Sequence, residues 1–450
     1  MENQLTKKYG LFTAVCMVIG TVIGSGIFFR NEAILAVIGG NLWLGVFAWL
    51  LGGLITLICA YVFATLAGKY EKVGGLLTYA EELLGPRFAH LLGWYMAFMF
   101  YPPITGILAW VSARFTVILF GWDVNPSFSG QTYSLALFYL VAIYAVNALS
   151  PKLAGKVQVS TTIIKVIPLI AMGIIGTIIG VSNGTTLSNI QSTYVTTPVS
   201  NPFLAALVAT AFAYMGWDGV INLNSEIKDS RKNLPIALVG GLLIIITIYI
   251  LYFIGIFSAA PIEELAGGHG ISGAFASIFT NVGGTALFVF IIISCIGTLN
   301  GLMMTGQRAF YSIAVRNNGF APSLFAQVDN QTNVANNAGV LSLLVSATWI
   351  LVYAGNFAGW YGNFFFDIPA LVPISFNAFM IPVYLRVMAK EDDFNIFNRY
   401  IAPILAICGS LFLIYAVFYN HGILAILVFL AVFVLISIVG LVLYRNNNES

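Results

Sequence analysis

Long apolar runs separated by short polar segments fill almost the whole 450-residue chain. A helix needs roughly 20 consecutive apolar residues to cross a bilayer, and the runs predict twelve such helices. They are expected at 11–37, 43–67, 90–120, 132–149, 158–181, 203–226, 236–259, 283–313, 338–354, 364–388, 400–419 and 422–444. The pattern therefore predicts an all-α membrane protein in which residues 1–450 form one integral membrane domain.

The composition agrees with this pattern. Hydrophobic residues make up 59% of the chain and charged residues 8%, whereas soluble domains carry roughly a quarter charged residues. A soluble protein is therefore excluded. The net charge of +2 comes from basic residues scattered over short loops, so the sequence predicts contact with a lipid bilayer and no binding of nucleic acid.

Basic residues gather on one side of the predicted spans. With the N-terminus in the cytoplasm, sixteen of the 19 Lys and Arg residues fall in cytoplasmic loops or ends. Arg30 falls outside, while Arg114 and Lys165 lie at membrane depth. Cytoplasmic loops of membrane proteins carry an excess of Lys and Arg. We therefore predict a multi-pass protein of the cell membrane (plasma or inner membrane) with cytoplasmic N- and C-termini.

Glycine interrupts two of the predicted spans near their middle. The first interruption is Gly24-Ser25-Gly26 in the first span, and the second is 214–217 in the sixth. Glycine lowers the cost of unwinding a helix, and unwound backbone at bilayer depth must line a cavity or be buried in protein. Paired interruptions in the two halves of a chain point to the substrate site of a transporter.

The order of the spans indicates an internal repeat. Each interrupted span is followed by four others, which predicts two five-helix units at 11–181 and 203–388. An odd number of spans inverts the second unit relative to the membrane. The last two spans, at 400–444, fall outside the repeat and are expected at the periphery.

The first interruption could bind an anion. If the helix unwinds at Gly24, the backbone N–H groups of the next half-helix and the positive end of its dipole would suit a carboxylate. Ser25 would add a hydroxyl donor. The alternative is close helix packing by small residues, which the spacing of Gly20 and Gly24 also fits. Both interpretations stay open at this stage.

The second interruption could bind a cation. Carbonyl groups freed at Gly216 would suit an ammonium group. Three aromatic residues would form a wall beside it: Phe212, Tyr214 and Trp217. An aromatic-rich helix that packs against lipid or its neighbours is the alternative. Tyr249 and Asn300 are polar groups at membrane depth that could line the same path or bond to a neighbouring helix.

Lys165 is the most unusual charged residue. It lies well inside the fifth span, with Thr161 one turn before it and Pro168 one turn after it. A lysine at the centre of a membrane helix costs about 2.5 to 3.5 kcal/mol on insertion scales. Reaching the inner surface would require the side chain to cover about two helical turns. We therefore expect its ammonium to point at carbonyls and hydroxyls of the broken helices, in the place of a monovalent cation.

Two acidic residues lie in or near the sixth span. Acidic side chains are expensive at membrane depth, so Asp218 and Glu226 are expected to face the bundle or the cytoplasmic mouth. Glu226 lies close in sequence to Lys228 and Arg231 and is expected to belong to an ion-pair network at the inner side.

Enzymatic and metal chemistry are not indicated. The three histidines are far apart in sequence, and no metalloprotease, nucleophile-elbow or nucleotide-binding motif appears. Cys16, Cys59, Cys295 and Cys408 lie in apolar stretches without a paired spacing and are expected to be buried. We therefore expect no enzymatic activity, no cofactor and no metal site.

The interrupted spans and several other segments form one set of motifs. The segments are Val18–Phe28, Gly74–Tyr79 with Gly85-Pro86, Phe212–Trp217, Glu226–Asp229, Asn233–Pro235 and Gly297–Gly301 with Arg308. Together they resemble the amino acid–polyamine–organocation transporters, specifically the L-type amino acid transporter group with its bacterial serine/threonine and alanine/serine/cysteine exchangers. The resemblance covers roughly residues 8–390.

The resemblance implies a fold and a set of contacts. The fold is the five-plus-five inverted repeat first seen in a leucine transporter, with discontinuous first and sixth spans. The substrate carboxylate would bind at Gly24, Ser25, Gly26 and Ile27. Its amino group would bind carbonyls near Val22, Phe212 and Met215. Phe212 resembles an outer aromatic gate, and Lys165 a lysine that stands where sodium-coupled relatives hold their second sodium.

These features together predict the function. We expect a secondary active transporter that exchanges small to mid-sized neutral L-amino acids by alternating access, without sodium. Because no cysteine lies in the loop before the fourth span, no obligatory heavy-chain subunit is expected. One alternative is a proton-coupled amino acid symporter with Lys165 as the titrating group. The other is a membrane receptor that senses amino acids without transporting them.

Overall fold

The computed structural model describes residues 7–70, 74–122, 125, 127, 129–195, 197–266, 270–362, 368–420 and 423–444. These residues form helices joined by turns and loops, with one isolated bridge between Tyr9 and Ile227. In the first half of the chain the elements are α1 (Leu11–Val22), α2 (Gly26–Ile38), α3 (Leu42–Lys69), α4 (Leu76–Leu84), α5 (Pro86–Tyr95), η1 (Met96–Phe100), α6 (Tyr101–Phe120), α7 (Gly130–Leu149), α8 (Pro151–Ser182) and α9 (Thr185–Gln191).

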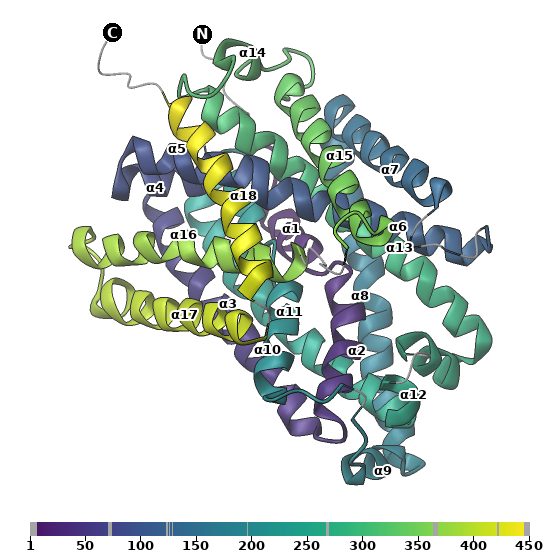
Figure 1. Ribbon diagram of the computed structural model, residues 1–450. Coiled ribbons are helices and arrows are strands. Elements are labelled where there is room, and N and C mark those ends of the chain that lie inside the picture. Colours follow the sequence, from purple (N-terminus) through teal and green to yellow (C-terminus); the bar gives the residue numbers. More distant parts are fainter. Residues whose placement is uncertain are drawn as a thin grey trace.

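The second half of the chain continues the helical pattern. Its elements are α10 (Pro202–Ala213), η2 (Trp217–Glu226), α11 (Ser230–Ala259), α12 (Ile262–Ala266), α13 (Gly270–Ala314), α14 (Pro322–Phe325), α15 (Asn336–Ala358), α16 (Ile368–Lys390), η3 (Phe397–Ile401), α17 (Ala402–Asn420) and α18 (Ile423–Val442). Figure 1 shows one helical bundle, with α9 and α12 at one end and α14 at the opposite end.

The helices lie where the spans are predicted, and their number is roughly consistent with twelve. Ten helical stretches in the described ranges are long and apolar enough to cross a membrane, and α1 with α2 forms a further pair bent by 50°. The helix α18 lies where the twelfth span is predicted and is apolar along its length. The prediction of an all-α protein with about twelve spans is therefore consistent with the structure.

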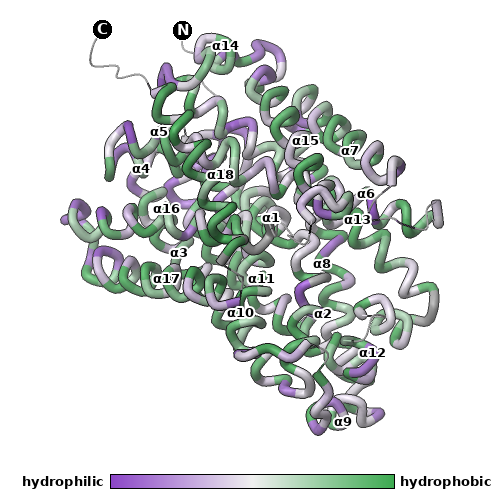
Figure 2. Tube along the Cα trace, in the orientation of Figure 1, coloured by the Kyte–Doolittle hydropathy of each residue, from purple (hydrophilic) through white to green (hydrophobic). Residues whose placement is uncertain are grey.

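The peripheral helices turn apolar side chains outward. Exposed side chains on α17 include Leu405 and Leu411, and those on α18 include Leu427 and Leu435. Hydrophobic residues cover both helices in Figure 2. Cys408, expected to be buried, is exposed on α17, because an apolar stretch on an outer helix faces lipid as well as protein.

Small residues let the inner helices approach each other closely. A Cβ atom added to Gly176 of α8 would lie 2.6 Å from the carbonyl oxygen of Gly255 on α11. One added to Gly180 would lie 2.0 Å from the carbonyl oxygen of Ser258. Backbone contact of this kind is typical of helix packing in membranes, and it fixes α8 beside α11.

The eighth span lies where it is predicted. The element α13 begins at Gly270 and runs to Ala314, and its membrane-crossing part is Val282–Ala314, in agreement with the span expected at 283–313. The part before it, Gly270–Phe279, is a shorter apolar helix. A Cβ atom on Gly284 would lie 3.4 Å from the Cβ atom of Ala276, so this short helix packs against the start of the span.

Candidate functional site

The first break separates α1 from α2. The helix α1 ends at Val22 and α2 begins at Gly26, so three residues between them lie outside regular helix. A Cβ atom on Gly24 would lie 3.2 Å from Thr298 Oγ1, and one on Gly26 would lie 2.8 Å from the Cα atom of Ala213. The glycines therefore serve both the break and the close packing of α10 and α13 against it, so the two interpretations left open by the sequence do not exclude each other.

The second break separates α10 from η2. The helix α10 ends at Ala213 and η2 begins at Trp217. Gly216 has a φ of 104°, a conformation that side chains disfavour and glycine adopts freely. A Cβ atom there would also lie 2.9 Å from the carbonyl oxygen of Thr21 on α1. The predicted discontinuity of the first and sixth spans is thus confirmed.

One tyrosine connects the ends of the two interrupted helices. The hydroxyl of Tyr249 on α11 lies 3.3 Å from the carbonyl oxygen of Val22 and 3.0 Å from that of Ala213. These carbonyls belong to the last turns of α1 and α10, where backbone acceptors lack partners within the helix. The completely buried Tyr249 therefore holds the two breaks side by side.

The two breaks face one small cavity. Its lining residues come from both breaks and from the adjoining parts of η1, α6 and α13. They are Thr21, Val22, Gly24, Ser25, Gly26, Phe100, Ile104, Leu108, Phe212, Met215, Gly216, Thr298 and Leu302. Larger grooves, such as the one between α3 and α17, have apolar walls and open on the periphery of the bundle.

The predicted site residues divide between the cavity wall and the layer behind it. The wall contains Val22, Gly24, Ser25, Gly26, Phe212, Met215 and Gly216. Six predicted residues do not line this cavity: Ile27, Lys165, Tyr214, Trp217, Tyr249 and Asn300. The structure therefore brings the backbone of the two breaks together but not all of the side chains proposed beside them.

The residues behind the wall make packing contacts. The hydroxyl of Tyr214 donates a hydrogen bond of 2.9 Å to the carbonyl oxygen of Trp49. Trp217 packs edge-on against Phe376, with 5.8 Å between ring centroids. Ile27 is completely buried near the start of α2. Their positions support the backbone of the breaks.

Asn300 joins three helices away from the cavity. Its Nδ2 atom donates to Gln158 Oε1 of α8 at 2.9 Å, and its Oδ1 atom accepts from Asn147 Nδ2 of α7 at 3.0 Å. The sequence left open whether Asn300 lines the path or bonds to a neighbouring helix, and in the structure it bonds to α7 and α8.

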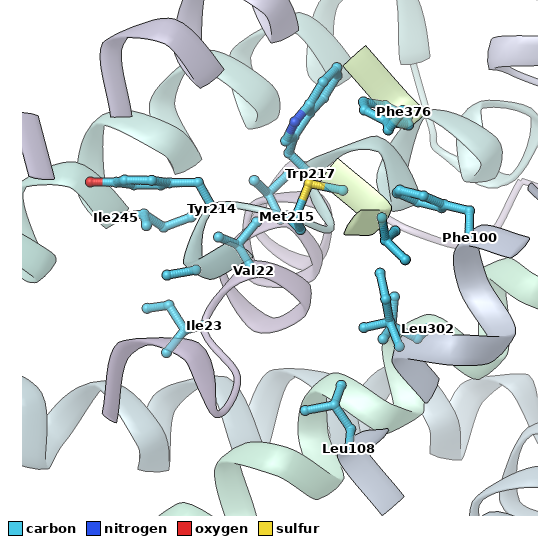
Figure 3. Packing of buried hydrophobic residues seen from close by; sticks show 14 of the residues in the cluster. Val22, Ile23, Phe100, Leu108, Tyr214, Met215, Trp217, Ile245, Leu302 and Phe376 are labelled. Atoms are coloured by element: carbon cyan, nitrogen blue, oxygen red, sulfur yellow. The ribbon is translucent and has the colours of Figure 1, made fainter. Parts of the chain in front are cut away.

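The far wall of the cavity was not predicted. It consists of Phe100, Ile104 and Leu108 of η1 and α6 together with Leu302 and Thr298 of α13. In Figure 3, Met215 lies between Val22 on one side and Phe100 and Leu302 on the other. Except for Thr298, these side chains from η1, α6 and α13 are apolar, and nothing in a uniformly apolar helix marks the face that lines a cavity.

Phe212 lies at the rim of the cavity. It is partly exposed, and the guanidinium carbon of Arg30 lies 5.4 Å from the centroid of its ring. A cation over an aromatic face is attracted to the ring. The pair links α10 to α2 at this rim.

Lys165 lies behind the first break. Its completely buried Nζ atom donates to the carbonyl oxygens of Gly20 at 2.8 Å, Ile23 at 2.6 Å and Ser294 at 3.2 Å. The Oγ1 atom of Thr298 lies 3.1 Å away. The side chain therefore does not extend to the inner surface. Its charge lies at the C-terminal end of α1, where the helix dipole favours a cation.

Glu226 closes the end of the bundle that carries the N-terminal segment. Its Oε1 atom accepts from Arg308 Nε at 2.5 Å, and its Oε2 atom lies 3.6 Å from Lys8 Nζ. Burial lowers the pKa of Lys8, while the charge of Glu226 opposes this shift. The expected ion-pair network exists, but the sequence neighbours Lys228 and Arg231 are not the partners of Glu226 in the described salt bridges.

The backbone reinforces this closure. The amides of Lys8 and Tyr9 donate to the carbonyl oxygen of Glu226 at 2.7 and 3.0 Å, and the amide of Lys228 donates to that of Tyr9 at 2.8 Å. The segment before α1 is thereby tied to the end of η2.

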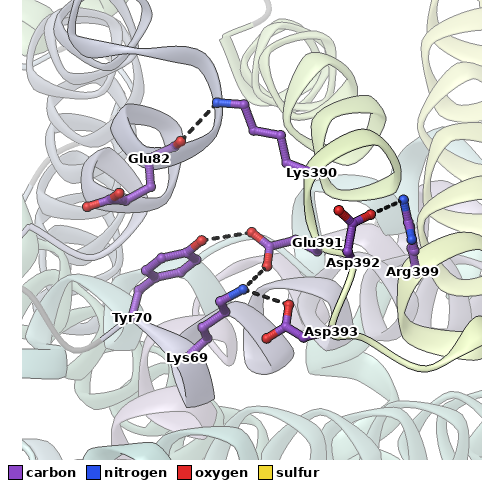
Figure 4. A network of polar contacts seen from close by, with 8 residues as sticks. All are labelled: Lys69, Tyr70, Glu82, Lys390, Glu391, Asp392, Asp393 and Arg399. Carbon is purple, nitrogen blue, oxygen red and sulfur yellow. Dashed lines mark hydrogen bonds and ion pairs between the residues drawn. The ribbon is translucent and has the colours of Figure 1, made fainter.

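A second polar network joins α3, α16 and η3 near the same end (Figure 4). Lys69 Nζ lies 2.5 Å from Glu391 Oε2 and 2.7 Å from Asp393 Oδ1, and the Tyr70 hydroxyl donates to Glu391 Oε1 at 2.8 Å. Burial and the Glu391 carboxylate raise the pKa of Tyr70 to about 12. The hydrogen bond from Lys69 lowers the pKa of Asp393. This network fixes α16 against α3.

Comparison with solved structures supports the fold. MhsT, solved in complex with L-phenylalanine, superposes with a TM-score of 0.59 at 16% sequence identity, covering 96% of this chain and 99% of that chain. At this identity the likeness concerns the fold alone. The predicted leucine-transporter-like fold is confirmed.

Sequence comparison identifies the family. The chain is 36% identical over 318 residues to the serine/threonine exchanger SteT of Bacillus subtilis (strain 168), covering 70% of each chain. It is 27% identical over 358 residues to the human Asc-type amino acid transporter 1, covering 78% of this chain and 66% of that protein. It is 28% identical over 313 residues to the mouse b(0,+)-type amino acid transporter 1, covering 69% of this chain and 63% of that protein.

These relatives are named as transporters and exchangers, not as enzymes, in agreement with the prediction. The family model described as amino acid permease matches residues 9–443. The chain therefore belongs to the amino acid permease family, the group that its motifs resemble.

Proposed function

We propose that this protein exchanges small to mid-sized neutral L-amino acids across the cell membrane by alternating access, without sodium. The observation that carries the proposal is the cavity that the two helix breaks share, beside which Lys165 lies at the end of α1. The ends of α1 and α10 and the start of α2 meet at this cavity. Opposite helix ends can bind the two opposite charges of a zwitterion.

The carboxylate of the substrate would bind at the start of α2. Free N–H groups and the positive end of the helix dipole meet there, at Ser25, Gly26 and Ile27. The Ser25 side chain does not cap the helix, so its hydroxyl is available to a ligand. Gly24 and Gly26 keep this part of the wall free of side chains.

The amino group would bind near the ends of α1 and α10. The carbonyl groups of Val22, Phe212 and Met215 lie at these ends and suit an ammonium group. Tyr249 already contacts the Val22 carbonyl at 3.3 Å, so in our proposal Tyr249 and the substrate share the acceptors of the two breaks. Phe212 at the rim would close over the bound substrate.

The wall chemistry supports a neutral substrate. Among the described residues that line the cavity, none carries an ionisable side chain. A charged side chain on the substrate would therefore be buried without a partner, at a cost of several kcal/mol (order of magnitude). Ile104, Leu108 and Leu302 offer apolar contact to the substrate side chain.

Sodium independence rests on Lys165. A monovalent cation at the end of α1 would need the oxygen atoms that Nζ already contacts, at Gly20, Ile23, Ser294 and Thr298. The ammonium fills this position with a covalently tethered charge. The exchange mode is supported by the naming of the Bacillus relative as a serine/threonine exchanger.

The proposal includes the arrangement in the membrane. The units 11–181 and 203–388 would form the inverted repeat, with 400–444 outside it. The N- and C-termini would be cytoplasmic, so the Glu226 network would close the inner side. The protein would act without an obligatory heavy-chain subunit, because its four cysteines all lie within helices.

Counterflow in proteoliposomes tests the proposal. Uptake of labelled L-alanine or L-leucine is expected only when the vesicles contain an unlabelled neutral L-amino acid, and it should be indifferent to a pH gradient. L-lysine and L-glutamate inside the vesicles serve as charged controls and should not support uptake.

Other outcomes would contradict it. Uptake into empty vesicles driven by a pH gradient would establish a proton-coupled symporter instead. A thermal shift with neutral amino acids in a folded sample without counterflow would establish a receptor that binds but does not transport.

A further inference from the structure

Asp218 lies completely buried in η2, two residues after the glycine of the second break. The hydroxyl of Tyr101 on α6 donates to its Oδ2 atom at 2.5 Å, and Asn222 Nδ2 donates to that hydroxyl at 2.6 Å. Because the tyrosine accepts from Asn222, its own hydrogen is directed at Asp218. The Oδ1 atom receives no hydrogen bond from another described residue.

No positive charge compensates this carboxyl group in the described part of the chain. The titratable groups that act on it are Tyr101 and, without a hydrogen bond, Tyr95 of α5. Of the elements packed against η2, α13 carries Arg308, which binds Glu226 together with Lys8. The helix α1 contains no Lys or Arg.

The charged and titratable groups on the remaining elements around η2 lie away from Asp218. On α3, Lys69 binds Glu391 and Asp393. On α4, the hydroxyl of Tyr79 accepts from Asn224. On α11, Arg231 and Lys232 are exposed at the start of the helix and do not act on Asp218, and the hydroxyl of Tyr249 contacts backbone carbonyls. The carboxyl group of Asp218 thus has one hydrogen bond and no ion pair.

We propose that Asp218 is a proton-binding site at membrane depth and is a neutral carboxylic acid in this conformation. Burying an ionised carboxylate without a counter-charge costs far more free energy than burying a neutral carboxylic acid whose hydroxyl has no acceptor. A buried carboxyl group in this position therefore binds a proton. In the neutral form Oδ2 is the carbonyl oxygen that accepts from Tyr101, and Oδ1 carries the proton taken from water.

The site is separate from the binding of an amino acid. Its carboxyl group is not part of the cavity lining, and Lys165 contacts α1 and α13 but not η2. The inference therefore goes beyond the proposed exchange and does not depend on it. Because Asp218 lies between Gly216 and the Glu226 network, an opening of that network that lets water reach η2 would allow the proton to leave.

Infrared spectroscopy of the full-length protein in lipid at neutral pH tests the proposal. The wild type is expected to show the carbonyl-stretch band of a protonated carboxylic acid, and Asp218→Asn is expected to lose it. Asp393→Asn is the matched control, since Asp393 is ion-paired with Lys69, and it should keep the band. A missing band in the wild type, or one that persists in Asp218→Asn, would overturn the proposal.

A second variant covers the case in which Asp218→Asn does not fold. Tyr101→Phe removes the donor to Oδ2, so the band should remain and move to higher frequency. An unshifted band overturns the assignment to Asp218. If Asp218 binds a metal ion instead, the carbonyl-stretch band is absent and the thermal stability rises with added sodium or potassium, and this result would overturn the proposal. Counterflow in the same samples reports on exchange separately, so the two proposals can fail independently.

Discussion

In the first break the chain bends around a charged side chain, whereas in the second it bends at a glycine in a left-handed conformation. Lys165 reaches three carbonyl oxygens and one hydroxyl around the first break. The second break depends instead on Gly216, which fits against Thr21 of α1.

The unwound backbone is held by a charged side chain at the first break and by the small size of glycine at the second. Carbonyl groups at a helix end in a membrane require a hydrogen-bond donor or a cation. At the first break the ammonium of Lys165 on α8 fills this role. At the second break the Tyr249 hydroxyl donates to the carbonyl oxygen of Ala213 at the end of α10. A change of charge should therefore disable the first break, and a change of volume the second.

The largest effect is expected for Lys165→Ala. It removes charge-assisted hydrogen bonds worth about 1.5–3 kcal/mol each, so the exchange rate should fall by about 100-fold or more. The protein should still fold, because Thr298 also contacts the Gly20 and Ile23 carbonyls. Counterflow and size-exclusion chromatography measure the two quantities. Lys156→Ala, exposed on the same helix, should behave like wild type, and normal turnover in Lys165→Ala would refute the role assigned.

A smaller effect is expected for Gly216→Ala. The left-handed conformation costs a side chain about 1–2 kcal/mol, and the added Cβ would also meet the Thr21 carbonyl at 2.9 Å. We expect a lower melting temperature and roughly tenfold slower exchange. Gly240→Ala is the control, because no atom lies within 4 Å of its added Cβ and alanine favours a helix. Equal effects of the two substitutions would contradict steric control.

Tyr249→Phe should have a weaker effect again. It removes a single hydroxyl that contacts both breaks, a loss of about 0.5–1.5 kcal/mol. The apparent affinity for a neutral amino acid should fall about fivefold, as measured by thermal shift. Tyr415→Phe on the exposed face of α17 should leave it unchanged. If Tyr249→Phe binds as well as wild type, the hydroxyl does not hold the two breaks together.

The smallest effect concerns the Lys69 network, far from both breaks. The pKa of Asp393 is lowered in the folded state, so the pair contributes stability above the usual aspartate pKa near 3.9 and loses it as pH falls through the lowered pKa. Asp393→Asn should slightly lower the melting temperature at neutral pH. The melting temperature of the variant should then fall less than that of the wild type as the pH is lowered, because asparagine does not titrate. A variant with an unchanged acid profile would show that this ion pair does not contribute.

The breaks could be predicted because their signals are local. Gly24, Gly26 and Gly216 interrupt apolar runs, and Lys165 is costly wherever it lies in a membrane helix. Each residue therefore carried its own evidence in the sequence. The same reasoning identified the leucine-transporter-like fold through the order of the interrupted spans and the family motifs.

The cavity wall and the polar partners could not be predicted because they depend on helix packing. Ile104 and Leu302 lie on apolar helices whose cavity-facing side has no signature in the sequence. Tyr101 and Asp218 meet across 117 positions of the chain. Asn300, for which the sequence left open a place on the path or a bond to a neighbouring helix, bonds to α7 and α8, since a polar group at depth forms hydrogen bonds with an adjacent helix.

In the function that we propose, the ammonium of Lys165 takes the place of a sodium ion at the first break. Counterflow of a labelled neutral L-amino acid in sodium buffer and in choline buffer separates this role from sodium-dependent transport. We expect equal initial rates in the two buffers for the wild type and a loss in both for Lys165→Ala. A wild-type rate that rises with sodium would contradict it.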